Sequence, residues 1–200
     1  NLQNKESDTY TIQLLNNNCK LKSQPLVPGN YFCNDFTQES LNNILEYQSA
    51  PEETAAIIME PVQGEGGIIS IPKDFFLYVR KVCDENNILL IVDEVQSGAG
   101  RTGTWWNIEQ KGVEPDLMTF GKGIASGWPL ACLVGKNYIM NNIGTSYLGG
   151  TYGGNAIASA ATLASIEIIE NENLLNNTNI MGSYIKNSLK NFEEIKEIRQ

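Results

Sequence analysis

The stretch ILLIVDEVQSGAGRTG, residues 88–103, decides the fold class that this chain predicts. Five apolar residues run directly into Asp93 and Glu94, and a glycine-rich loop follows at once. A short apolar run bounded by polar residues is typical of a strand buried in a parallel sheet. Ligands of open α/β sheets bind beyond the carboxyl ends of such strands, so the two acids mark a candidate binding edge.

A second strand is predicted upstream, and a helix connects the two. AAIIME, residues 55–60, is a short apolar run ended by Pro61 and the loop VQGEGG. Residues 72–85 place apolar side chains at helical spacing. A strand, a helix and a strand in this order form a βαβ unit, and its right-handed crossover makes the strands parallel. Glu60 and Asp93 should therefore lie at one edge of the sheet.

Two further strands are predicted as an antiparallel pair, LMTFGK at residues 117–122 and LACLVG at residues 130–135. Their connection, GIASGWP, is too short for a parallel crossover, which needs a dozen or more residues. Lys122 then lies in the turn between them. Further helices are predicted at residues 37–47, 156–170 and 174–192. We therefore expect an α/β fold: a mostly parallel sheet with helices on both faces and one antiparallel strand.

Composition limits the classes of function. The chain has 23 acidic and 14 basic residues, a net charge of −9, which argues against nucleic acid or an anionic membrane surface as a partner. No apolar run approaches the roughly 18 residues that span a bilayer. There is no histidine, and the four cysteines form no CxxC pair, so we expect neither a zinc site nor a Ser-His-Asp triad. Catalysis is left to Lys, Asp, Glu, Tyr or Cys.

The N-terminal residues and the cysteines of the chain indicate how the protein is processed and in which cellular compartment it lies. Dispersed cysteines favour a reducing compartment, here the cytosol or the mitochondrial matrix. The chain does not begin with Met, and its first 22 residues show neither a signal-peptide core nor the arginine-rich face of a transit peptide. We therefore expect a fragment of a longer protein.

Three hypotheses account for acids at the end of a buried strand. A nucleoside triphosphatase would need a GxxxxGK[ST] phosphate loop, which is absent. A dinucleotide site would use GAGRTG with Asp116, as in an NAD-dependent dehydrogenase. The stretch after that loop is broken by glycine and ended by proline, however, and Asp116 precedes its strand.

The third hypothesis uses Asp93 and Lys122 together. A carboxylate at a strand end can pair with a pyridinium nitrogen, and a lysine on a neighbouring turn can form a Schiff base with an aldehyde cofactor. Pyridoxal phosphate requires this pair of groups. Gly121 and Gly123 flank the lysine and leave room for a ring to approach the backbone.

Four stretches carry a resemblance to a known family: IIMEPVQGEGG, LLIVDEVQSGAGRTG, PDLMTFGKGIASGWPL and GGTYGGN. Over residues 55–174 the chain resembles the class III, or ω-amino acid, aminotransferases that use pyridoxal phosphate. Within that family it is most similar to the enzymes that act on 4-aminobutyrate. The resemblance implies the large domain of a fold-type I transferase over residues 1–170, with its N-terminal part missing, and the start of a small C-terminal domain at residues 171–200.

The resemblance also implies roles for cofactor-binding residues. Asp93 would pair with the pyridinium nitrogen, Val95 would pack on one face of the ring, and Gln96 would hydrogen-bond the phenolic oxygen. Lys122 would hold the cofactor covalently and then move the proton during transamination. Thr151 would donate to the cofactor phosphate of the neighbouring subunit, which implies a homodimer.

Glu65 is implied to pair with a substrate-binding arginine, and Glu60 to lie near the substrate. The implied reaction moves an amine from an ω-amino donor, such as 4-aminobutyrate, to a 2-oxo acid, 2-oxoglutarate. Ornithine-type and alanine–glyoxylate-type aminotransferases are alternatives, and so is a non-catalytic or truncated homologue. The residues also have ordinary structural alternatives: Asp93 as a loop cap, Lys122 as a solvated turn lysine, Thr151 as a helix N-cap and Glu65 as a loop acid.

Overall fold

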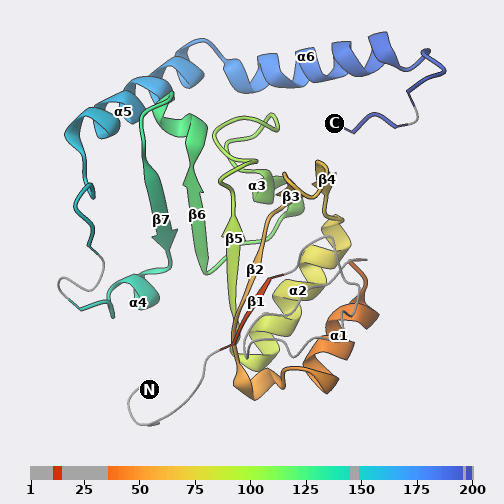
Figure 1. Cartoon of the computed structure of the whole chain (residues 1–200), viewed down its shortest axis with the longest axis vertical. Helices are drawn as coiled ribbons and strands as arrows, with labels where there is room; N and C mark the ends of the chain where they lie inside the picture. Colours follow the sequence, from red (N-terminus) through yellow and green to blue (C-terminus); the bar gives the residue numbers. More distant parts are fainter. Residues whose placement is uncertain (1–10, 15–35, 145–148, 196, 200) are drawn as a thin grey trace.

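A five-stranded sheet organises the chain (Figure 1), in a computed structural model that describes residues 11–14, 36–144, 149–195 and 197–199. The strand order is β1-β2-β5-β6-β7. These strands span Thr11–Leu14 (β1), Thr54–Met59 (β2), Leu89–Asp93 (β5), Leu117–Gly121 (β6) and Ala131–Gly135 (β7). The first three neighbouring pairs are parallel and β6 pairs with β7 antiparallel. The predicted α/β class, with its mostly parallel sheet and one antiparallel pair, is confirmed.

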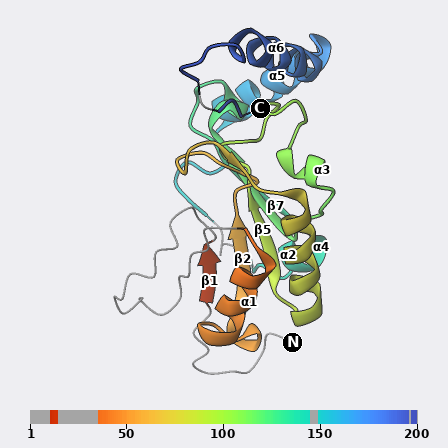
Figure 2. The ribbon, with the colours of Figure 1, turned by 90° about the vertical axis from the view of Figure 1, so that its right-hand side faces the viewer.

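The helices that carry the apolar core lie on one face of the sheet (Figure 2). They are α1, Gln38–Tyr47, and α2, Lys73–Asn86. The apolar residues of α2 repeat at helical spacing, and the five on one face are all buried: Phe75, Phe76, Val79, Val82 and Cys83. Thr37 caps α1 by accepting the N–H of Ser40 at 3.2 Å, and Asn87 ends α2 in the left-handed region.

Two long helices follow the sheet, α5 at Ala156–Asn171 and α6 at Leu174–Leu189. Figure 1 shows both at the end of the sheet where β5 and β6 finish. Between them Asn173 adopts a left-handed conformation, φ 52°, which separates the two helices. The Ser165 hydroxyl of α5 lies 2.7 Å from that of Ser126, which fixes α5 against the turn that follows β6. No helix in the described ranges is long and apolar enough to cross a membrane.

Several short elements were not predicted. These are β1, the hairpin of β3 (Val62–Gln63) and β4 (Ile69–Ser70), the helices α3 (Asn107–Lys111) and α4 (Asn137–Met140), and the 3-10 turn η1 (Pro51–Glu53). The stretch after GAGRTG, expected to be broken by glycine and ended by proline, holds only the short helix α3. Gly112 ends α3 after five residues with φ 68°. Cys19 and Cys33 lie outside the described residues, whereas Cys83 and Cys132 are free thiols.

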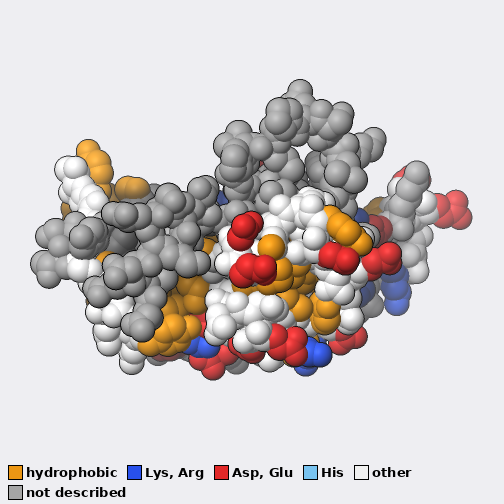
Figure 3. Space-filling view, turned by 90° about the horizontal axis from the view of Figure 1, so that it is seen from below, with side chains coloured by type: hydrophobic (Ala, Val, Ile, Leu, Met, Phe, Trp, Pro, Cys, Tyr) orange, Lys and Arg blue, Asp and Glu red, His pale blue; other side chains and the backbone are white. Residues whose placement is uncertain are grey.

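Acidic side chains are prominent on the face of the molecule seen in Figure 3, where Asp and Glu outnumber Lys and Arg. This view agrees with the net charge of −9. A surface rich in negative charge repels polyanions such as nucleic acids. The expectation that nucleic acid is not the partner therefore stays a prediction with this surface in its favour.

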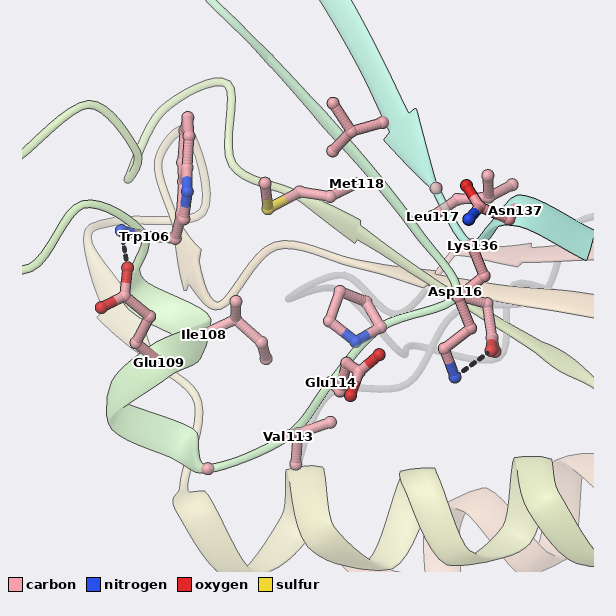
Figure 4. Close-up of a pocket in the computed structure, with 14 residues that line it drawn as sticks. Trp106, Ile108, Glu109, Val113, Glu114, Asp116, Leu117, Met118, Lys136 and Asn137 are labelled. Atoms are coloured by element: carbon pink, nitrogen blue, oxygen red, sulfur yellow. Dashed lines mark hydrogen bonds and ion pairs between the residues drawn. The ribbon is translucent and has the colours of Figure 1, made fainter. Parts of the chain in front are cut away.

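Asp116 forms a buried ionic cluster at the amino end of the sheet. Its carboxylate accepts the Leu90 N–H at 2.8 Å and pairs with Arg80 at 2.8 Å. It also pairs with Lys136 at 2.9 Å (Figure 4). Burial alone would raise the pKa of Asp116, but these three donors outweigh it and hold that pKa below its usual value. The cluster joins β5, β6 and the end of β7 to α2, and it occupies the carboxylate that a dinucleotide site would need.

We expect the substitution Asp116→Asn to lower the free energy of unfolding by about 2 kcal/mol near neutral pH, because Arg80 and Lys136 lose their shared counter-charge. The amide oxygen of the new side chain would still accept the Leu90 N–H. The folded pKa of Asp116 lies below the unfolded value of about 3.9. Its stabilisation is therefore complete above that value and disappears as the pH falls through the folded pKa.

Urea unfolding from about pH 7 down to about pH 3 tests this expectation. The gap between Asp116→Asn and the unsubstituted protein should be constant above about pH 5 and shrink below about pH 4. The control is Asp84→Asn, which removes the second, 64% exposed partner of the same arginine. Its effect should stay below about 1 kcal/mol. A gap that does not change with pH would contradict the ionic explanation.

Candidate active site

The carboxyl edge of the sheet gathers most of the predicted site residues. Met59 of β2 pairs with Val92 of β5, so Glu60 and Asp93, the next residues, lie side by side where these strands end. Asp93 in turn pairs with Thr119 of β6, three residues before Lys122. The expectation that parallel strands place these groups at one edge is confirmed by the register.

Asp93 and Glu94 occupy different environments although they are neighbours. Burial alternates along β5, and Leu90, Val92 and Glu94 share the buried side, whereas Asp93 is half-buried. The Val95 N–H donates to Asp93 Oδ1 at 2.9 Å, which holds the carboxylate over the turn. Glu94 is 1% exposed. Asp93 is therefore the acid that a ligand at this edge can reach.

Lys122 lies directly after β6 and begins the 3-10 turn η2, Lys122–Ala125. Its φ of 47° falls in the left-handed region, which costs a non-glycine residue energy and often marks a functional position. The side chain is exposed, and its ammonium donates to Gln96 Oε1. Two residues predicted separately as cofactor ligands thus meet across the edge between β5 and β6.

The loop VQGEGG closes one side of this cluster. Glu60 Oε2 accepts the Gly64 N–H at 3.0 Å, which braces the loop. A Cβ on Gly64 would stand 2.6 Å from Gln96 Cγ, so only glycine allows the loop to lie this close to Gln96. Glu65, the next residue, is exposed. The observed contact of Glu60 is with the loop backbone, and its predicted position near a substrate stays a prediction.

Thr151 does not join this cluster through any described contact. It is exposed in a turn before α5. The N-cap of α5 is Asn155, whose Oδ1 accepts the N–H groups of Ile157 and Ala158 at 3.0 and 3.1 Å. The alternative explanation of Thr151 as a helix N-cap is therefore wrong, and its predicted role toward a neighbouring subunit stays a prediction.

Gly98 and Gly103 of GAGRTG allow neighbouring groups to pack closely against the loop backbone. A Cβ on Gly98 would stand 2.7 Å from the carbonyl oxygen of Glu94 and from the Trp106 ring. Gly103, with φ 86°, lies against Asn179 of α6, whose side-chain amide donates to the Gly103 carbonyl at 3.1 Å. The loop does not open a helix directly after β5, which a dinucleotide fingerprint requires. With Asp116 held at the opposite edge, the structure argues against that hypothesis.

A hollow of about 680 Å³ lies apart from this cluster, between α3, the segment before β6 and the end of β7 (Figure 4). Its lining is mainly apolar, with Trp106, Val113 and Met118 among it. The aspartate within it, Asp116, is already paired with Lys136. None of the predicted site residues lines this hollow.

The groups at the carboxyl edge fit an aldehyde-bearing pyridine ring. They are a reachable primary amine at Lys122, a carboxylate at Asp93 and a side-chain amide at Gln96, all at the ends of the two neighbouring strands β5 and β6. Among the described residues no group of three acids, cysteines or histidines could hold a metal ion. Glu94 and the exposed Arg101, whose guanidinium lies against Gly123 next to Lys122, were not predicted as part of the site.

Comparison with known proteins agrees with this arrangement. The model of the family "Aminotransferase class-III" matches residues 8–200. The chain belongs to the class III aminotransferase family. The cofactor of this family is pyridoxal phosphate, so the cofactor and fold type predicted from the sequence are confirmed at family level.

Three similar proteins illustrate the relationship. The 4-aminobutyrate aminotransferase GabT of Escherichia coli (strain K12) is 49% identical over 150 residues, 75% of this chain and 35% of the relative. The 5-aminovalerate aminotransferase DavT of Pseudomonas putida is 45% identical over 180 residues, 84% of this chain and 42% of the relative. The ornithine aminotransferase structure from Toxoplasma gondii, crystallised with oxidised glutathione and with partial occupancy of pyridoxal phosphate, superposes with a TM-score of 0.84 at 27% identity. The superposed region is 98% of this chain and 50% of the Toxoplasma gondii chain. The chain thus spans about a third to a half of these proteins.

Proposed function

We propose that the protein containing this chain is a pyridoxal-phosphate-dependent aminotransferase that takes its amine from an ω-amino donor, best 4-aminobutyrate, and passes it to 2-oxoglutarate. The contact between the Lys122 ammonium and Gln96, at the edge where Asp93 ends β5, carries the proposal. Both curated relatives described above act, by their names, on donors with a terminal amine. An ornithine-type or alanine–glyoxylate-type donor is the alternative within the family.

Residues on both sides of the ring would hold the cofactor. Asp93, whose carboxylate accepts the Val95 N–H, would also accept a hydrogen bond from the protonated ring nitrogen, and Val95 would pack on a ring face. Gln96, pressed against Gly64, would reach the phenolic oxygen. When bound, pyridoxal phosphate supplies an electron sink that stabilises negative charge on the substrate carbon.

Lys122 would anchor the cofactor and then move the proton. Its backbone is left-handed and its side chain is exposed, so the amine lies at the carboxyl edge of the sheet. Among the described hydrogen bonds, its one partner there is Gln96. Once the substrate amine has displaced it from the cofactor, the freed Lys122 amine would act first as general base toward the substrate carbon and then as general acid with the same proton.

The remaining predicted residues concern substrate and assembly. Glu65 is exposed on the loop that Glu60 braces and would pair with a substrate-binding arginine, while Glu60 would lie near the substrate. Thr151 would reach the cofactor phosphate of a second subunit, in a homodimer. We place the division between the large and small domains near residue 171, where α5 ends.

The decisive experiment uses the full-length protein that contains this chain. It is saturated with pyridoxal phosphate, reduced with borohydride and digested, and the modified peptide is identified by mass spectrometry. We expect a yellow protein with a single reduced adduct on Lys122. Adducts spread over surface lysines such as Lys81, or no adduct, would overturn the proposal in favour of a non-catalytic homologue. Amine transfer from 4-aminobutyrate, 5-aminovalerate and ornithine, measured side by side, then identifies the donor.

A further inference from the structure

Glu94 is the most deeply buried acid near the proposed cofactor ligands, and none of the roles above uses it. It stands between Asp93 and Val95 in the chain and is 1% exposed. Its Oε1 accepts the Ile108 N–H at 2.7 Å, and its Oε2 accepts the Ser97 hydroxyl. A buried carboxylate is costly unless it is hydrogen-bonded, so these bonds show that the side chain has a fixed place.

The backbone of Glu94 is held as firmly as its side chain. Its N–H donates to the Thr119 carbonyl of β6 at 2.8 Å, and its carbonyl accepts the Gly98 N–H at 2.9 Å. One residue therefore joins β6, the turn at residues 94–98 and the start of α3. Asp93, Val95 and Gln96 lie on the short segment that these bonds hold.

Helix α3 also contacts the β3–β4 hairpin, on the other side of the site. Lys111, in the last turn of α3, is 7% exposed and donates to the Ser70 hydroxyl of β4 at 2.9 Å. Burial raises the pKa of Glu94, although the hydrogen bonds from Ser97 and Ile108 lower it in part. Burial lowers the pKa of Lys111, although the negative charge of Glu94 raises it in part. Helix α3 is thus bonded to Glu94 at one end and to Ser70 of β4 at the other, so the hairpin that carries Glu65 is tied to the strand end.

We propose that Glu94 is a positioning residue, whose carboxylate fixes segment 93–96 so that Asp93 and Gln96 meet the cofactor in the correct geometry. The inference rests on the proposed function. Groups that orient ligand-binding side chains contribute about 10- to 100-fold to affinity or activity in metal sites, and a cofactor held by a short loop depends on the same restraint.

Two substitutions of similar size separate the effect of the Glu94 hydrogen bonds from the effect of side-chain volume. Glu94→Leu removes both acceptors, whereas Glu94→Gln keeps an oxygen for the Ile108 N–H and can donate its amide to the Ser97 hydroxyl. In the full-length protein we expect Glu94→Leu to weaken pyridoxal phosphate binding at least about tenfold and to lower kcat more than it raises KM for the donor. Glu94→Gln should restore affinity to within about threefold of the unsubstituted protein.

A matched control lies on the same helix. Glu109 is exposed, and its Oε1 accepts the Trp106 N–H at 2.8 Å (Figure 4), so it also fixes the start of α3, but no described hydrogen bond joins it to segment 93–96. Glu109→Leu should bind pyridoxal phosphate within about twofold of the unsubstituted protein. Equal losses in Glu94→Leu and Glu109→Leu would show a purely structural effect and overturn the inference.

The measurements are the affinity for pyridoxal phosphate, read from the absorbance of the bound cofactor, and the melting temperature of each cofactor-free variant. Unchanged affinity in a folded Glu94→Leu overturns the inference while the proposed function stands. Failure of the unsubstituted protein to bind pyridoxal phosphate would instead refute the proposed function. If Glu94→Leu does not fold, Ser97→Ala decides, because it removes one of the two bonds. A loss of about two- to fivefold supports the inference, and no loss overturns it.

Discussion

Transamination should fall by at least about 1,000-fold when Lys122 is replaced by alanine in the full-length protein, because proton transfer by a positioned side chain typically contributes about 10²- to 10⁴-fold. Lys122 is exposed and its side chain meets Gln96 alone among the described hydrogen bonds, so its removal should leave the fold intact. The measurement is kcat for the donor half-reaction, with the melting temperature as the test of folding.

Lys81→Ala is the matched control for this loss. Lys81 is also an exposed lysine, 65% accessible, and its ammonium stands 3.8 Å from Glu85 on the outer face of α2. It should keep kcat within about twofold, because exposed pairs of this kind contribute little. A Lys122→Ala variant that retains more than about a tenth of the activity would show that another group moves the proton, and the role assigned to Lys122 would be wrong.

The parts of the site that the sequence predicted are those that follow from strand direction. The apolar runs before Glu60 and Asp93, joined by one helix, require parallel strands with a common carboxyl edge. The short connection between β6 and β7 allows only an antiparallel pair, which places Lys122 beside that edge. Topology and connection length are properties of the sequence alone, so the positions of these three residues could be predicted.

The contacts that complete the site depend on side-chain packing, which periodicity does not show. Gln96 lies in a loop, and its meeting with Lys122 and Gly64 follows from the close approach of three separate segments. The hairpin β3–β4 and the helix α3 are too short to show a periodic pattern. Glu94 could not be singled out either, because residues 88–92 are all apolar and both faces of the strand look alike in the sequence; only the structure shows that Leu90 and Val92 are on the more buried face.

Asp93→Asn should lower kcat by at least about 100-fold, the cost typically seen when a preorganised electrostatic group is lost from an active site. Asparagine has the same size and its oxygen can still accept the Val95 N–H, now at 2.9 Å, so the turn should persist. What disappears is the negative charge opposite the ring nitrogen, and with it the charge-assisted hydrogen bond that favours the protonated ring. The visible spectrum of the bound cofactor, followed against pH, reports that change independently of turnover.

The neighbouring acid supplies the sharpest comparison for this prediction. Glu94→Gln makes the same change, carboxylate to amide, one residue further along, and it should cost no more than about threefold in kcat. The difference follows from burial, since both carboxylate oxygens of Glu94 are already bonded to Ser97 and Ile108, whereas Asp93 keeps a half-buried carboxylate at the edge. A large loss in Glu94→Gln with a small loss in Asp93→Asn would exchange the two roles. A large loss in Asp93→Asn and in Glu94→Leu, with little loss in Glu94→Gln, would show why the strand ends in two acids: the first meets the ring, and the second holds the first in place.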